Sequence, residues 1–388
     1  MVLEALHRWF RPLLVALFHP RLSWSLRWRL LLLQPITLLT YSINTIPYLF
    51  SRPFVVEHLP LAPGRSLRVL VFKAPGHGVR SVPSQRDDDD DAAVASEEHQ
   101  QQQQKSSSSS SSPLRPLHVE IHGGSFLGGL PESNAAFDAR VAAETGAVVV
   151  SLSYRYAPEH VFPAAIDDID AAIAWIAAHA ARRWGADPQL MTAGGFSAGG
   201  NLAVAATQQP DRQAPSATRV RGIVTFYAAL DLRLAPDEKP RPRGMPSASS
   251  DPLRVLVPLF DAYMAGARRA KTTMGHRGGD YDDGDARLNP VLARRETLPE
   301  RMLLVVPAVD ILYAEQMAFA ERVNGEDERE GRRERRRVET MVVDGMFHGY
   351  LEVPDAIVEK EFKDQAFTRG VAFLRETYAQ HGWSWGAA

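Results

Sequence analysis

The chain of 388 residues contains no cysteine. Disulfide bonds, thiolate metal sites and a cysteine nucleophile are therefore excluded, although the compartment stays open because cysteine-free chains suit reducing and oxidising environments alike. An excess of charge of one sign is also lacking. The formal net charge is −2, which gives no reason to expect nucleic acid or another polyanion as a partner.

Metal-binding patterns are missing as well. Asp87 to Asp91 form an acidic run, but adjacent carboxylates without the glycine of a turn do not make a calcium loop, and we expect neither a metal nor a cofactor. The run lies in a low-complexity stretch from Ala74 to Pro116, together with runs of glutamine and serine, that cannot bury enough apolar surface to become ordered. We predict a disordered insertion at about 74–116.

Long apolar runs are scarce, and only one stretch near the N-terminus comes close to membrane-spanning length. Leu30 to Ser51 contains no charged residue, but polar residues and two prolines dilute its hydrophobicity. The preceding stretch Trp9 to Leu17 is apolar and flanked by arginines, as in helices that lie in a membrane interface. A cleaved secretory leader is not expected, because no small-residue cleavage site follows. Residues 1–53 keep two interpretations: membrane association through residues 9–51, either spanning or interfacial, or a lid of helices.

The most informative stretch is Gly195-Phe196-Ser197-Ala198-Gly199, which has the pattern Gly-x-Ser-x-Gly. It follows an apolar run at 189–193 that suits a buried parallel strand, and it precedes helix-forming residues at 201–206. A strand, a tight turn and a helix in this order place the serine on a strained turn with its hydroxyl exposed, and the flanking glycines avoid collisions with neighbouring backbone. Ser197 is the candidate nucleophile, and the backbone N–H of Ala198 is a candidate donor to an oxyanion.

A second glycine cluster, His122-Gly123-Gly124-Ser125, follows an alternating strand at 117–121. Glycines at this position let backbone N–H groups approach a reacting carbonyl. Gly123 and Gly124 are therefore the other candidate oxyanion donors, and His122 and Ser125 support the motif.

A base and an acid that orients it are expected after the serine in chain order. His348 is the candidate base, because it lies in a loop directly after a strand at 339–343. Asp310 is the candidate acid, two residues after the apolar strand at 302–308. Asp344 is nearer to His348 in sequence and competes for this role, but a turn residue explains its position more simply.

Strands alternate with helices through most of the chain. A hairpin at 54–72 precedes the insertion, and Ile166, Ile169, Ile173 and Ile176 recur at helical spacing after a buried strand at 147–152. The alternation predicts an α/β fold with a mostly parallel, doubly wound sheet within residues 54–388. It lapses at 231–290 into Pro- and Gly-rich sequence around a helical pattern at 255–267.

These motifs resemble the α/β-hydrolase fold-3 family, the hormone-sensitive-lipase-like esterases and lipases, over about residues 115–375. The most specific block runs from Tyr154 to Ala165 and is very similar to a stretch that those enzymes carry between the oxyanion loop and the nucleophile turn. Ser125 stands where many members carry a third glycine, as in some plant carboxylesterase-like members. Phe196 replaces a common aspartate, which we expect to reshape the pocket.

The resemblance implies an α/β-hydrolase fold with a helical lid, to which 231–290 contributes, and a catalytic triad of Ser197, Asp310 and His348. It implies a serine carboxylesterase or lipase-like enzyme that cleaves short- to medium-chain esters of a small-molecule substrate through an acyl-serine. The same triad also serves amidases, formamidases and acyltransferases. A non-enzymatic small-molecule receptor of the same fold is a further alternative, which the presence of all three candidate residues disfavours.

Overall fold

The computed structural model describes residues 2–20, 22–74, 113–208, 219–234, 238–242, 245, 260–265, 284–331 and 337–386. Residues 75–112 of the predicted insertion and much of the region 231–290 lie outside the described residues. The first strand after the insertion begins at Arg115, so the predicted end of the insertion at Pro116 falls inside that strand.

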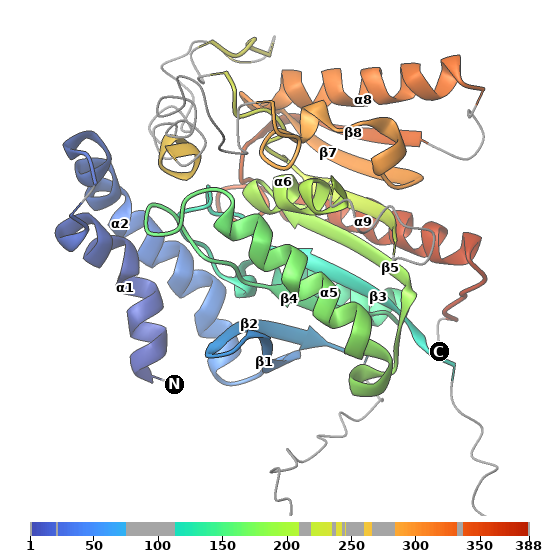
Figure 1. Cartoon of the computed structure of the whole chain (residues 1–388), viewed down its shortest axis with the longest axis horizontal. Coiled ribbons are helices and arrows are strands. Elements are labelled where there is room, and N and C mark those ends of the chain that lie inside the picture. Colours follow the sequence, from blue (N-terminus) through green and yellow to red (C-terminus); the bar gives the residue numbers. More distant parts are fainter. Residues whose placement is uncertain are drawn as a thin grey trace, which may run out of the picture.

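Within the described residues, eight strands form one sheet in the order β1-β2-β4-β3-β5-β6-β7-β8 (Figure 1). Strand β2 is antiparallel to both of its neighbours, and all other neighbouring pairs are parallel. The strands are β1 (Phe54–Ala62), β2 (Arg65–Phe72), β3 (Arg115–Ile121), β4 (Val148–Leu152), β5 (Ala186–Phe196), β6 (Val220–Phe226), β7 (Arg301–Val309) and β8 (Arg337–Phe347).

Helices cover both faces of the sheet, and each face has its own apolar core. One face carries α5 (Ala164–Trp184), α6 (Ala198–Ala205) and α8 (Tyr313–Arg329), whereas the other carries α4 (Ala135–Thr145) and α9 (Lys360–Gln380). In Figure 1, α5 and α6 lie in front of the sheet and α9 behind it. The isoleucines at helical spacing in α5 are all buried against the sheet, as expected of an amphipathic helix. The predicted doubly wound, mostly parallel sheet is confirmed.

Two N-terminal helices, α1 (Val2–Phe18) and α2 (Trp24–Thr45), lie together at one end of the molecule and are followed by the 3₁₀ turn η1 (Ile46–Leu49) (Figure 1). Arg27 holds them together, because its guanidinium donates to the carbonyls of Ala16, Leu17 and His19 at the end of α1. Among the described residues, no single helix is long and apolar enough to cross a membrane. The bent pair Trp24–Pro35 and Thr37–Tyr48 meets that test only when its two halves are taken together, by length and composition.

The remaining short elements are 3₁₀ turns. They are η3 (Pro131–Asn134), η4 (Ala206–Gln208), η7 (Pro290–Leu292) and η8 (Arg295–Thr297). Residues 260–265 of the predicted lid helix are helical, and Tyr263 stacks on Phe126 with 4.0 Å between ring centroids. This part of the predicted lid region therefore packs on the glycine-rich loop after β3.

Candidate active site

Ser197 occupies the turn between β5 and α6, with φ at +51° and ψ at −116°. Its N–H donates to the carbonyl of Phe226 on the neighbouring strand, which fixes the turn to the sheet. A Cβ on Gly199 would lie 2.0 Å from the carbonyl oxygen of Ile121, and one on Gly195 would lie 2.3 Å from Gly199 C. Backbone packs this closely only because both positions are glycine, so the motif produces a strained turn held by its neighbours.

The structure brings Ser197, His348 and Asp310 together from three separate segments. Ser197 Oγ lies 2.9 Å from His348 Nε2, and His348 Nδ1 lies 2.9 Å from Asp310 Oδ2. The other carboxylate oxygen of Asp310 accepts the N–H of Leu312 at 2.9 Å, which fixes its orientation. Asp310 is buried, whereas the competing Asp344 is exposed on β8. The contact with Asp310 selects the imidazole tautomer that carries its proton on Nδ1 and leaves Nε2 free to accept the serine proton.

The candidate oxyanion donors surround the serine. Ala198 begins α6, and a Cβ on Gly123 would lie 3.4 Å from Ser197 Cβ. Gly124 and Ser125 continue this loop with positive φ values of 119° and 54°. In the described residues, the non-glycine residues with positive φ are Ser125, Phe126, Ser197 and Tyr227, and all four border this site. Such a concentration of strained backbone is typical of functional sites.

The imidazole ring of His122 stabilises the oxyanion loop through its contacts. Its Nδ1 donates to the carbonyl of Gly123 at 2.6 Å, and its ring stacks on Tyr154 with 4.6 Å between centroids. The Nε2 atom lies 3.2 Å from the hydroxyl of Tyr156. Burial lowers the pKa of His122 to about 4, so the ring is neutral at physiological pH. A neutral, stacked imidazole positions the loop instead of transferring protons.

Two residues of the site belong to no recognisable sequence motif. The ring of Tyr227, at the end of β6, lies 4.9 Å from the ring of His348, and its hydroxyl donates to Glu352 Oε1 at 3.4 Å. Glu352 sits in the turn after His348, where burial raises the pKa of its carboxyl and outweighs the opposing effects of His348 and Tyr227. No spacing rule identifies either residue. Tyr227 reaches the site only because β6 ends beside Ser197, and nothing in the sequence distinguishes Glu352 from an ordinary turn residue after His348.

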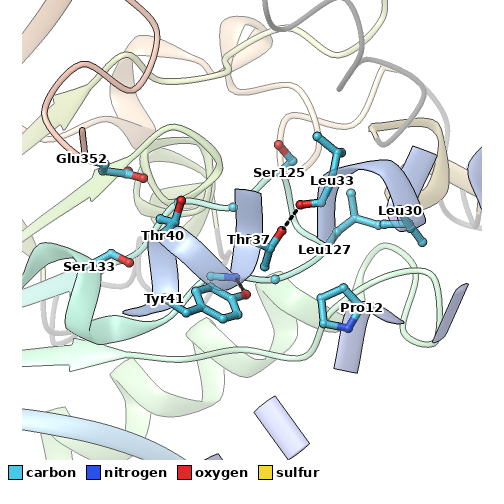
Figure 2. A pocket seen from close by; sticks show the side chains of 14 residues that line it. Pro12, Leu30, Leu33, Thr37, Thr40, Tyr41, Ser125, Leu127, Ser133 and Glu352 are labelled. Atoms are coloured by element: carbon cyan, nitrogen blue, oxygen red, sulfur yellow. Dashed lines mark hydrogen bonds between the residues drawn. The ribbon is translucent and has the colours of Figure 1, made fainter. Parts of the chain in front are cut away.

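A cavity of about 370 Å³ lies between the N-terminal helices and the oxyanion loop. Residues from α1 and α2 form one wall, and residues from Gly123 to Gly129 form the other (Figure 2). The hydroxyl of Tyr41 accepts the N–H of Gly129 at 2.9 Å, and Arg11 donates to the carbonyls of Leu127 and Tyr156. The N-terminal helices thus pack against the oxyanion loop and enclose the cavity from one side.

Phe196, which was expected to reshape the pocket, does not line this cavity. Its ring stacks on Phe226 with 4.4 Å between centroids and is buried on the face covered by α4 and α9. The side chain at this position points into the core because Phe196 ends β5, along which successive side chains alternate between the two faces of the sheet. In the part of the chain that the structure describes, no group of three or more His, Cys, Asp or Glu residues could hold a metal ion.

Residues 118–352 match a protein family described as the alpha/beta hydrolase fold. Lipase 2 of Moraxella sp. (strain TA144) is 29% identical over 259 residues, which make up 60% of this chain and 54% of that lipase. The carboxylesterase NlhH of Mycobacterium tuberculosis is 44% identical over 94 residues, or 24% of this chain and 29% of that protein. The matched part of this chain thus spans about half of the first relative and less than a third of the second.

The fold also matches solved structures. A hyperthermophilic esterase from Pyrobaculum calidifontis superposes with a TM-score of 0.59 at 21% identity, covering 95% of this chain and 97% of the other. At this identity the likeness concerns the fold alone.

Proposed function

This chain belongs to the α/β-hydrolase fold-3 family, and we propose that it is a serine hydrolase that cleaves carboxylic ester bonds through an acyl-serine intermediate. One observation carries the proposal: the unbroken path of hydrogen bonds from Ser197 Oγ through the imidazole of His348 to the carboxylate of Asp310. The two relatives described above are named as a lipase and a carboxylesterase, which supports an ester as the substrate.

In the first half of the reaction, Ser197 Oγ attacks the ester carbonyl while His348 Nε2 takes its proton. Asp310 holds the imidazole in the required tautomer and stabilises the imidazolium that forms. The N–H groups of Gly123, Gly124 and Ala198 are proposed to receive the oxyanion, and loss of one such donor typically slows turnover about 10²- to 10³-fold. His348 then protonates the departing alcohol.

In the second half, His348 removes a proton from water, which attacks the acyl-serine, and the imidazolium returns that proton to Ser197 Oγ as the acid is released. The first proton transfer joins Ser197 Oγ and His348 Nε2, which lie 2.9 Å apart in this structure.

The cavity supports small esters as substrates. Its volume of about 370 Å³ lies near the lower end of the range for small-molecule sites, and its lining is mostly apolar. We propose acyl chains of short to medium length, because longer chains would have to extend beyond the wall formed by α1 and α2.

Labelling with a fluorophosphonate, which reacts with activated serines, tests the proposal. The intact chain should be labelled, Ser197→Ala and His348→Ala should not, and Asp344→Asn should be labelled like the parent. Hydrolysis of p-nitrophenyl butanoate should follow the same pattern. A folded parent chain that is neither labelled nor able to hydrolyse the ester would refute the enzyme and favour a receptor that only binds its ligand.

We also propose that the outer surface of α1 and α2 binds a membrane surface. Eleven of the sixteen large apolar side chains exposed in the described residues lie between positions 10 and 50, including Phe18 and Trp24, each 75% exposed. Residues 5–56 contain six arginines and no acidic residue. Exposed tryptophan and phenylalanine beside arginine suit the interface of a bilayer that contains anionic lipids.

Flotation of the full chain with vesicles measures this association. We expect binding to phosphatidylserine-containing vesicles and weaker binding to pure phosphatidylcholine. Replacing both Phe18 and Trp24 by serine should abolish flotation and leave fluorophosphonate labelling intact, because neither side chain lines the cavity. Ile357→Ser, which removes an apolar side chain that is 67% exposed elsewhere on the surface, is the control. Undiminished flotation of the double variant would refute the proposal.

A further inference from the structure

The cavity beside the nucleophile has two chemically different ends. Pro12, Leu30 and Leu127 line one end, whereas Thr40, Ser133 and Glu352 line the other, as Figure 2 shows. An ester that fills this space with hydrocarbon alone would satisfy the apolar end and leave polar groups without partners at the other.

Glu352 lies close to the reacting centre. Its Oε1 is 3.6 Å from the position that a Cβ on Gly123 would occupy, and that same position is 3.4 Å from Ser197 Cβ. The backbone N–H of Glu352 donates to the carbonyl of Gly349 at 3.0 Å, which stabilises the turn that carries this side chain. The carboxylate therefore borders the space through which a substrate reaches the nucleophile.

The hydrogen-bonding capacity of this carboxylate is largely unused. Within the described part of the chain, Glu352 forms no ion pair with lysine or arginine, and its carboxylate accepts one hydrogen bond, from Tyr227 at 3.4 Å. A carboxylate accepts about four hydrogen bonds.

We propose that Glu352 determines specificity by accepting a hydrogen bond from a hydroxyl or ammonium group of the substrate. The hydrocarbon part of the same substrate then fills the end lined by Leu30 and Leu127. The substrate class is an ester that carries a hydrogen-bond donor a few bonds from its carbonyl. This inference rests on the proposed ester hydrolysis and adds the chemical feature by which the site selects among esters.

Matched substrate pairs test it. The first pair, p-nitrophenyl 3-hydroxybutanoate and p-nitrophenyl 3-methylbutanoate, differs by a hydroxyl in place of a methyl on the acyl side. The second pair, 2-hydroxyethyl butanoate and propyl butanoate, makes the same change on the alcohol side. p-Nitrophenyl 3-aminobutanoate, with an ammonium group in place of the hydroxyl, tests the second kind of donor. Each kcat/KM is divided by the rate constant for hydroxide-catalysed hydrolysis of that ester, which removes intrinsic differences in reactivity.

We expect the parent enzyme to prefer the hydroxyl member in at least one pair by roughly 10- to 100-fold, the range for a hydrogen bond to a charged group. Glu352→Gln keeps an acceptor without the charge, so it should retain a smaller hydroxyl preference and lose any ammonium preference. Glu352→Met should lose both preferences. Thr37→Val is the control, because it changes a cavity-lining hydroxyl that is already bonded to the carbonyl of Leu33 and should leave the ratio unchanged.

Three outcomes would overturn the inference. A parent enzyme that hydrolyses the members of both pairs equally well rules out selection of a donor, while ester hydrolysis still stands. A Glu352→Met variant that slows both members of a pair by the same factor shows a structural role only. If no ester is hydrolysed and Ser197 is not labelled by the fluorophosphonate, the proposed function fails and this inference fails with it.

Discussion

The adjacent glycines of the oxyanion loop offer a sharp test of the site, because the structure predicts different results for the same substitution at each. A Cβ on Gly123 would lie 3.1 Å from the carbonyl oxygen of Phe196 and 3.4 Å from Ser197 Cβ. These contacts are tight but can be relieved by small shifts, so we expect Gly123→Ala to fold with about 1–3 kcal/mol of strain. The new methyl group would stand against the nucleophile and displace a proposed oxyanion donor.

Loss of a donor and of access should lower kcat/KM for p-nitrophenyl butanoate roughly 10²-fold or more in Gly123→Ala. The rate of fluorophosphonate labelling should fall in parallel, and the melting temperature should fall by about 2–4 °C for each kcal/mol of strain.

Gly124→Ala is the matched comparison. Its φ is +119°, and its Cβ would lie 2.2 Å from the carbonyl oxygen of Gly128, which small shifts cannot relieve. We expect this variant to unfold at a markedly lower temperature or to be recovered as insoluble protein. The reasoning would be refuted if Gly123→Ala kept activity within about threefold of the parent, or if the two variants were equally destabilised.

Three further predictions follow from the contacts of the site. Asp310→Asn should lower kcat about 10⁴-fold through the wrong imidazole tautomer, whereas Asp344→Asn should match the parent in the same ester assay. Tyr41→Phe removes the acceptor for the N–H of Gly129, which should lower the free energy of unfolding by about 1–3 kcal/mol. We expect KM to rise several-fold with little change in kcat. An unchanged KM would show that this contact does not support the cavity. The pKa of His122 is about 4 in the folded chain, whereas the ordinary value for histidine is 6.5. As the pH falls, the unfolded chain therefore binds a proton at this position before the folded chain does. The free energy of unfolding should decrease between pH 6.5 and pH 4. Urea unfolding at pH 7.5 and pH 5 should therefore show a loss about 2 kcal/mol larger in the parent than in His122→Gln, and equal losses would contradict a neutral buried ring.

Several features of the fold and site were predictable because they depend on local patterns. The alternation of apolar strands and amphipathic helices indicated the doubly wound sheet. Strands of a parallel sheet are buried on both faces, so they are apolar throughout, and each connection between parallel strands contains a helix that covers one face. The glycines around Ser197 and Gly123 indicated tight turns after strands, because only glycine tolerates backbone packed so closely. The position of Asp310 and His348 just beyond strands placed both at the same edge of the sheet.

Other features depended on contacts that no local pattern encodes. Nothing around Glu352 or Tyr227 distinguishes them from ordinary turn and core residues, and they join the site only because β6 and β8 both end beside Ser197. Residues 1–53 had two interpretations because an apolar helix face suits either a protein surface or a bilayer.

The sequence by itself determined the class of fold, the candidate nucleophile with its base and acid, and the two glycine turns, because strand order and turn chemistry are set by residue type and short spacing. Only the tertiary structure decided that the buried face of α2 packs on the oxyanion loop, that Asp310 and not Asp344 meets the imidazole, and that a second carboxyl borders the nucleophile. These contacts join residues that are far apart in sequence. They form only when the two apolar cores pack, and the packing depends on the shapes of all the buried side chains together.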